Sequence, residues 1–276
     1  MADEAVDKDR MPLLAHLVEL RSRLIKCAIG FVLAFILCYY FSKEIFDFLA
    51  APLHTAFVRH FGKPTEGLMI YTQLYEKFFT EIKVAFWAAM FLSFPWVATQ
   101  MWMFIAPGLY KHEKSAFLPF LAATPVLFVA GAALAYYVIF PFAWEFFLSF
   151  EQAADKDALQ IKLMPKVSEY LSLVMTLIFA FGVSFEMPVL LTLLARVGIV
   201  SSAGLIKKWR HAFAVIFIIA AILTPPDVIS QLGLAIPLCI LYFISIIAAK
   251  MVEKKRAEKQ SEIDKEVEEA VRRADS

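Results

Sequence analysis

The chain has 276 residues, of which 61% are hydrophobic, and its formal net charge at pH 7 is +1. A soluble domain of this length is usually closer to half apolar, and the mean hydropathy here is +0.67. These values exclude an ordinary soluble domain and indicate a polytopic membrane protein. The near-neutral net charge gives no indication of a binding partner, and no nucleic-acid partner is predicted.

Residues 1–23 are predicted to be a cytoplasmic amphipathic segment. The first twelve are polar and of mixed charge, and they lack the pattern of a signal peptide. Helical spacing then places one apolar stripe opposite one polar stripe. The apolar stripe is Leu13, Leu17, Leu20 and Leu24, and the polar stripe is His16, Glu19, Arg23 and Lys26. This pattern predicts a helix at the membrane interface that leads into the first span. The residues alone leave open whether Glu19 belongs to an anchor, paired with Arg23, or to a functional site.

Six apolar segments are predicted to be transmembrane helices within a membrane domain of residues 24–249. They are Leu24–Phe41, Val84–Ile105, Ser115–Phe140, Tyr170–Ala195, Ala212–Thr224 and Val228–Ala249. The alternating pattern of a β-barrel is absent, so helices must satisfy the backbone polar groups in lipid. The fifth segment is shorter than the roughly 20 residues that span a bilayer. The predicted fold class is therefore an all-α polytopic membrane protein with six transmembrane helices, the last two short.

The distribution of lysine and arginine predicts the orientation. With the N-terminus in the cytoplasm, most of these residues fall on the cytoplasmic side, so both termini are expected to be cytoplasmic. Apolar pieces at 44–53 and 141–150 interrupt the two longer outer loops and predict short helices at the outer interface. The charged tail, 250–276, is expected to be a solvated helix or a disordered segment.

Motifs for catalysis or cofactor binding are absent from the sequence. Gly62 and Gly67 have the spacing of a phosphate-binding loop, but Leu68 stands where that motif needs lysine. There is neither a G-x-S-x-G nucleophile motif nor an H-E-x-x-H zinc motif. The three cysteines lie in apolar segments without ligand spacing. We expect no enzyme activity, no metal and no cofactor.

Glu186 is the only charged residue between Tyr170 and Ala195. A charge inside a membrane segment costs at least about 2.5 kcal/mol on insertion scales, so an intramembrane carboxylate points to function by default. Pro188 lacks an N–H and leaves the carbonyl of Ser184 without its helical partner. The pair predicts a kink and a polar notch in one helix face; a glutamate simply bonded to a neighbouring helix is the alternative.

Two connections between segments carry further candidate residues. In the first cytoplasmic loop, 100–119, Phe104 suits a headgroup-level anchor, Pro107 breaks the helix and Glu113 stands among basic residues. In the outer turn, 223–231, Asp227 is a candidate N-cap of the sixth helix, and Thr224 and Gln231 place polar groups beside the shortest span. A plain loop and a capped turn are the alternatives.

Together these motifs resemble the TatC family, the multispanning subunit of the twin-arginine protein translocase. The likeness is carried by HLVELR at 16–21, APL at 51–53, WMFIAPGLYKHE at 102–113, FGVSFEMPV at 181–189 and LTPPDVISQ at 223–231. It covers roughly residues 12–250. It implies a curved, glove-like bundle in the bacterial inner membrane.

The resemblance also implies a function. TatC recognises the twin-arginine signal peptides of folded cargo proteins and assembles a multimeric complex with the single-span subunits TatA and TatB, driven by the proton gradient. It implies that Glu19 and Glu113 bind the signal arginines, with Leu20, Arg21 and Phe104 beside them. Glu186 would line an intramembrane groove, and Thr224 and Gln231 would belong to the surface that docks TatA or TatB. We expect structural roles for Pro52, Pro95, Pro107, Pro188 and Asp227.

A proton-coupled small-solute transporter that uses Glu186 as its proton carrier is the alternative function. Such transporters often contain inverted repeats, and no internal repeat is evident in this sequence. An intramembrane protease is disfavoured because no credible nucleophile or aspartate pair is present.

Overall fold

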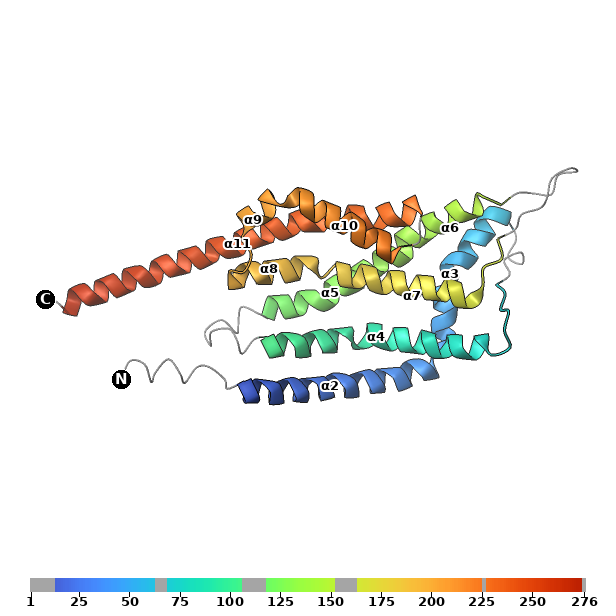
Figure 1. Cartoon of the computed structure of the whole chain (residues 1–276), viewed down its shortest axis with the longest axis horizontal. Helices are drawn as coiled ribbons and strands as arrows, with labels where there is room; N and C mark the ends of the chain where they lie inside the picture. The colour runs from blue at the N-terminus through green and yellow to red at the C-terminus, as the bar shows by residue number, and fades with distance from the viewer. Residues whose placement is uncertain (1–12, 63–68, 106–117, 152–162, 225–226, 275–276) are drawn as a thin grey trace, which may run out of the picture. The chain divides into compact units, whose positions relative to one another are not determined.

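The computed structural model describes residues 13–62, 69–105, 118–151, 163–224 and 227–274, and most of these residues are helical (Figure 1). The helices are α2 (Leu13–Tyr40), α3 (Ser42–Phe61), α4 (Glu76–Ile105), α5 (Leu118–Leu134), the π-helix η4 (Ala135–Ile139), α6 (Phe140–Leu148), α7 (Val167–Ser184), α8 (Met187–Val197), α9 (Ser202–Lys207), α10 (Trp209–Leu223) and α11 (Val228–Ala274). Among the described residues, five stretches are long and apolar enough to cross a membrane, and α10 is apolar but shorter. This is the all-α, polytopic class that the sequence predicts.

The chain divides into two compact units. The first comprises Met1–Pro125 and Trp144–Met175, and the second comprises Val126–Ala143 and Thr176–Ser276. The described parts of α2, α3 and α4 belong to the first unit, and α8 to α11 belong to the second. The contacts below lie within one unit or the other.

In the first unit, α2 and α4 pack side by side in antiparallel directions (Figure 1). Small buried residues form the centre of their contact, namely Ala34 and Cys38 on α2 with Ala85 and Ala89 on α4. Small side chains let two helix backbones approach closely, which is how helices gain van der Waals contact in lipid. Nearer the start of α2, a Cβ added at Gly30 would lie only 2.6 Å from the Trp96 ring, so this position also requires close approach.

Helix α3 confirms that the connection after the first apolar segment contains helical structure, although the helix is longer than the predicted piece at 44–53. Its C-cap, Gly62, has φ of 68°, a left-handed conformation that glycine adopts without strain. The buried hydroxyl of Tyr170, at the start of α7, donates a 2.9 Å hydrogen bond to the carbonyl of Leu49 on α3. This bond ties α3 to the beginning of α7.

The prediction of a separate short helix at 141–150 is wrong. Helix α5, the π-helix η4 and α6 follow one another without a break from Leu118 to Leu148. The apolar residues continue past Phe140 through α6, so the hydrophobic stretch does not end where the sequence predicts. The third apolar stretch is therefore longer than the predicted Ser115–Phe140.

Two glycines in the second unit allow close packing between the chain segments that contain Phe128 and Phe181. A Cβ at Gly131 would lie 2.5 Å from the backbone oxygen of Phe181, and a Cβ at Gly182 would lie 2.6 Å from the Phe128 ring. Neither helix has room for a side chain at these positions. The two glycines therefore fix how closely α5 and α7 approach.

We expect Gly131→Leu to destabilise the protein by about 1–3 kcal/mol, because overpacking forces backbones or side chains apart. The matched control is Ala130→Leu, since Ala130 is the neighbouring residue on α5 and is exposed. Thermal unfolding of the detergent-purified protein measures the difference. Equal unfolding temperatures for the two variants would contradict a tight contact at Gly131.

The last two helices differ in length, which corrects the prediction that both are short. Helix α10 has 15 residues and is about 22 Å long at 1.5 Å per residue. Helix α11 has 47 residues and continues from the apolar span through the charged tail; it extends past α8 and α9 of its own unit (Figure 1). Residues 250–274 contain neither glycine nor proline and are rich in Lys, Glu, Arg and Ala, which are good helix formers.

Candidate functional site

Glu19 lies on α2, where its carboxylate is held by Arg23 one turn along the helix. The Arg23 Nη2 and Glu19 Oε1 atoms are 3.2 Å apart, and about a fifth of each side chain is exposed. The predicted pairing of Glu19 with Arg23 is confirmed. A carboxylate has two oxygens and several lone pairs, so this pairing leaves acceptor capacity for a second cation.

Residues of helix α4 hold the Arg23 side chain that pairs with the Glu19 carboxylate. Arg23 Nη1 donates a 3.1 Å hydrogen bond to Gln100 Oε1 and contacts the sulfur of Met103 at 3.5 Å. The Trp96 indole N–H donates to the Lys26 carbonyl at 3.1 Å. The first turns of α2 and the last turns of α4 therefore form one polar cluster, which we call the Glu19 cluster: Glu19, Arg23, Gln100 and Met103.

The sequence interpretation did not include Gln100 and Met103 in the candidate site. A polar residue such as Gln100 close to the end of an apolar span is a signal that could have indicated it. Gln100 is almost completely buried, at 2% exposure. Its amide therefore orders the Arg23 side chain, which in turn fixes the Glu19 carboxylate.

The residues predicted to accompany Glu19 lie near the same end of the α2–α4 pair. Leu20 and Phe104 are half-buried and Arg21 is exposed, so Glu19 and Arg21 lie on different sides of α2. Leu17 and Leu24 of the apolar stripe point outward, since each is 59% exposed. Arg23 of the polar stripe contacts α4 instead.

Glu113 and Pro107 lie outside the described residues, in the connection between α4 and α5. Their predicted roles remain predictions. Helix α4 ends at Ile105, close in sequence to this connection, and its last turns carry Gln100 and Met103 of the Glu19 cluster.

Glu186 lies where the fourth apolar stretch bends. Helix α7 ends at Ser184 and α8 begins at Met187, so the predicted kink at Pro188 is present. Glu186 is the N-cap residue of α8 and is half-buried, and its own carbonyl accepts the Leu190 N–H at 3.0 Å. The Glu186 side chain makes no capping hydrogen bond to α8, so the carboxylate is not held by the N–H groups at the start of this helix.

The turn between α10 and α11 contains the other predicted residues, although Pro225 and Pro226 lie outside the described residues. Asp227 Oδ1 accepts the Ser230 N–H at 2.6 Å, which confirms the N-cap of α11. The buried Thr224 hydroxyl donates to the Ala220 carbonyl at 2.9 Å, within its own helix. Gln231 is half-buried in the first turn of α11.

Pro52 and Pro95 lie inside α3 and α4, respectively. Each proline has a threonine hydroxyl nearby that bonds a helix carbonyl: Thr55 donates to Ala51 at 2.9 Å, and Thr99 donates to Pro95 at 2.7 Å. These bonds give carbonyls near the prolines an additional donor. They fit the structural roles expected for the two prolines.

A second polar group that the sequence interpretation missed surrounds Glu76, the first residue of α4. Its carboxylate accepts the Thr72 N–H at 2.8 Å and the Ser168 hydroxyl at 2.6 Å. A single β-bridge between Ile70 and Lys166 joins the same two chain segments. Glu76 therefore holds the beginnings of α4 and α7 together, at the end of α4 opposite to Gln100.

Comparison with known proteins identifies the family of this chain. The family model of the Sec-independent protein translocase protein (TatC) matches residues 15–237. The chain belongs to the TatC family. It is 50% identical to the TatC protein of Magnetococcus marinus over 92% of this chain and 89% of that protein, and 40% identical to TatC of Escherichia coli over 87% and 88%.

Solved structures agree with this membership. The chain is similar to a crystal structure described as the twin arginine translocase receptor TatC, with a TM-score of 0.72, 35% sequence identity, and coverage of 86% of this chain and 99% of that one. As a TatC protein with several apolar helices, the chain is a multi-pass membrane protein and a component of a protein translocase.

Proposed function

We propose that this protein is the signal-peptide receptor and core scaffold of the twin-arginine translocase. In this proposal it binds the twin-arginine signal peptides of folded cargo proteins and assembles with TatA and TatB in the bacterial inner membrane. Both termini would be cytoplasmic, and the proton gradient would drive export. The related crystal structure described as a receptor supports the first part of this role.

The Glu19 cluster is the observation that carries the proposal. A signal arginine needs an anionic partner that accepts its planar guanidinium, and carboxylates do this with two parallel hydrogen bonds. The Glu19 carboxylate is oriented by Arg23, is partly exposed, and already binds one guanidinium. An incoming arginine would add to this arrangement, and Glu113 would provide the second carboxylate.

Arg23 also explains how the largely buried Glu19 carboxylate is stabilised when no signal peptide is bound. Helix positions four apart are neighbours, so the Glu19–Arg23 pair stabilises α2 in the unbound state. Binding would then redistribute an existing ion pair rather than pair an isolated charge. This is favourable because an unpaired charge near the membrane is costly.

The exposed faces of α10 and α11 would dock a single-span subunit. Ile218, Ile222, Val228 and Ile236 are more than half exposed and provide apolar surface beside Thr224 and Gln231. Because Thr224 is buried and its hydroxyl is already bonded to Ala220, Thr224 would support the docking surface from beneath, and the Gln231 amide would contribute hydrogen bonds to the partner. Glu186 would bind polar atoms of an inserted segment.

Site-specific photocrosslinking tests the receptor proposal. With a photoreactive residue at position 19 or 113 in the full chain, we expect crosslinks to a twin-arginine signal peptide and loss of those crosslinks when both arginines become lysines. Lysine keeps the charge but lacks the fork geometry of guanidinium. Equal crosslinking to any hydrophobic signal peptide would contradict the proposal.

A further inference from the structure

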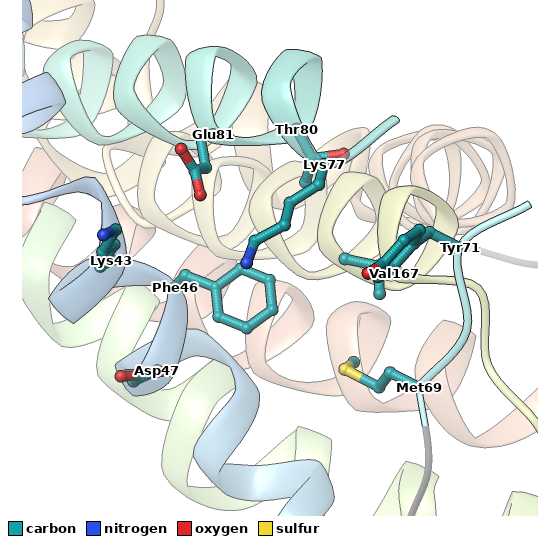
Figure 2. A pocket seen from close by; sticks show the side chains of 9 residues that line it. All are labelled: Lys43, Phe46, Asp47, Met69, Tyr71, Lys77, Thr80, Glu81 and Val167. Atoms are coloured by element: carbon teal, nitrogen blue, oxygen red, sulfur yellow. The ribbon is translucent and has the colours of Figure 1, made fainter. Parts of the chain in front are cut away.

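A pocket of about 470 Å³ lies in the first unit, at the end of the α2–α4 pair that is away from Glu19. Helix α3, helix α4, the segment before α4 and the start of α7 form its walls (Figure 2). The lining residues are Lys43, Phe46, Asp47, Met69, Tyr71, Lys77, Thr80, Glu81 and Val167. Its volume is within the range of about 300–1,000 Å³ that is typical of small-ligand sites.

Two cations and two anions line this pocket. Lys43 and Asp47 come from α3, and Lys77 and Glu81 come from α4. Within the described residues, the ion pairs are formed by other side chains, and none of these four charges takes part in one. In Figure 2 the Lys77 side chain extends from α4 in the direction of Phe46 on α3. The charges therefore surround a hollow and are available to a ligand that carries both signs.

The surroundings place the pocket at the depth of lipid headgroups. Large aromatic side chains at the end of α2 and in the segment before α4 are exposed, including Tyr40 at 80% and Tyr71 and Tyr75 at 58%. Aromatic residues of this kind gather at the interface between membrane and water. Along α2 the exposed surface then becomes aliphatic, at Leu33, Ile36 and Leu37, which suits acyl chains.

We propose that this pocket binds the headgroup of a zwitterionic phospholipid with a primary ammonium group, as in phosphatidylethanolamine. Lys43 and Lys77 would bind the phosphate, for which lysine acts as a point charge. Asp47 and Glu81 would accept hydrogen bonds from the ammonium. A phosphatidylcholine ammonium has no N–H to donate, and phosphatidylglycerol has no cation for the two carboxylates, so the pocket distinguishes the three headgroups.

Native mass spectrometry of the detergent-purified full chain tests this site. Phosphatidylethanolamine, phosphatidylcholine and phosphatidylglycerol with identical acyl chains are added at equal concentration. We expect about fivefold higher retention of phosphatidylethanolamine than of phosphatidylcholine, the size expected for one exposed ion pair. The variant K43Q/K77Q should lower retention of all three lipids, because each carries the phosphate that the two lysines bind, and should still retain phosphatidylethanolamine better than phosphatidylcholine. The variant D47N/E81Q should lose the preference for phosphatidylethanolamine over phosphatidylcholine and should retain phosphatidylglycerol most strongly, because two lysines then remain without carboxylates.

The matched control is R59Q/E145Q, which removes an exposed ion pair in the same unit that does not line the pocket. This variant should keep the preference of the unmodified protein. Equal retention of the three lipids by the unmodified protein, or an unchanged preference in D47N/E81Q, would overturn the proposal. Displacement of the lipid by an equal concentration of soluble glycerophosphoethanolamine would overturn the assignment to a membrane lipid. Stronger retention of phosphatidylglycerol by D47N/E81Q is a gain that an unfolded variant cannot produce.

Discussion

Glu19→Gln is expected to weaken binding of a twin-arginine signal peptide by roughly 10- to 150-fold, because a hydrogen bond to a charged group contributes about 1.5–3 kcal/mol. Glutamine has nearly the same size and helix propensity as glutamate, so α2 should remain intact. Titration of a fluorescent signal peptide into the protein reconstituted in nanodiscs measures the effect. Export of a folded reporter protein should fall in parallel.

Arg23→Gln separates a binding role of Glu19 from a structural one. This change removes the internal partner of Glu19 and leaves the carboxylate for the peptide, so affinity should stay within about threefold of the unmodified protein. If both variants lose affinity equally, the Glu19–Arg23 pair acts by stabilising α2, and Glu19 is not a direct contact. A twin-lysine peptide should bind the unmodified protein about as weakly as the twin-arginine peptide binds Glu19→Gln.

Glu186→Ala is expected to reduce export of a folded reporter by roughly tenfold, whereas Glu186→Gln should retain most of the activity. Alanine removes a hydrogen-bonding group from the α7–α8 turn, and such a loss typically costs about 1–3 kcal/mol. Glutamine keeps hydrogen bonding but cannot ionise. The reporter is measured outside the cytoplasm, and the amount of each variant in the membrane is measured in the same cells.

Leu190→Ala is the matched control, because Leu190 lies one turn along α8 and is half exposed. It should leave export unchanged. Full activity of Glu186→Ala would contradict a role for Glu186 in the groove. If Glu186→Gln were as inactive as Glu186→Ala, the titrating carboxyl would matter, and the proton-carrier function would gain support.

Some features of the candidate site could be predicted because they are local in sequence. The Glu19–Arg23 pair follows from a spacing of four residues on a helix. The Asp227 cap follows from an acidic residue directly before α11, and the bend at Glu186 follows from the missing N–H of Pro188. Each depends on residues within one or two helical turns, where backbone geometry fixes the neighbours.

Other features depend on contacts between distant segments. The bond from Arg23 to Gln100 and the bond from Ser168 to Glu76 join residues far apart in the chain. Nothing in the spacing of these residues indicates their partners. The sequence also did not reveal that Arg23 of the polar stripe contacts α4, because an amphipathic pattern defines two faces without saying which one meets protein.

By itself, the sequence determined that this is an all-α, multi-pass membrane protein, because a bilayer admits few ways to satisfy backbone polar groups. Its motifs also indicated the TatC family. Only the tertiary structure decided that Gln100 and Arg23 orient Glu19, and that Lys43, Asp47, Lys77 and Glu81 surround one pocket. These features arise from how separate helices pack, and packing joins residues whose distance along the chain carries no information about their contact.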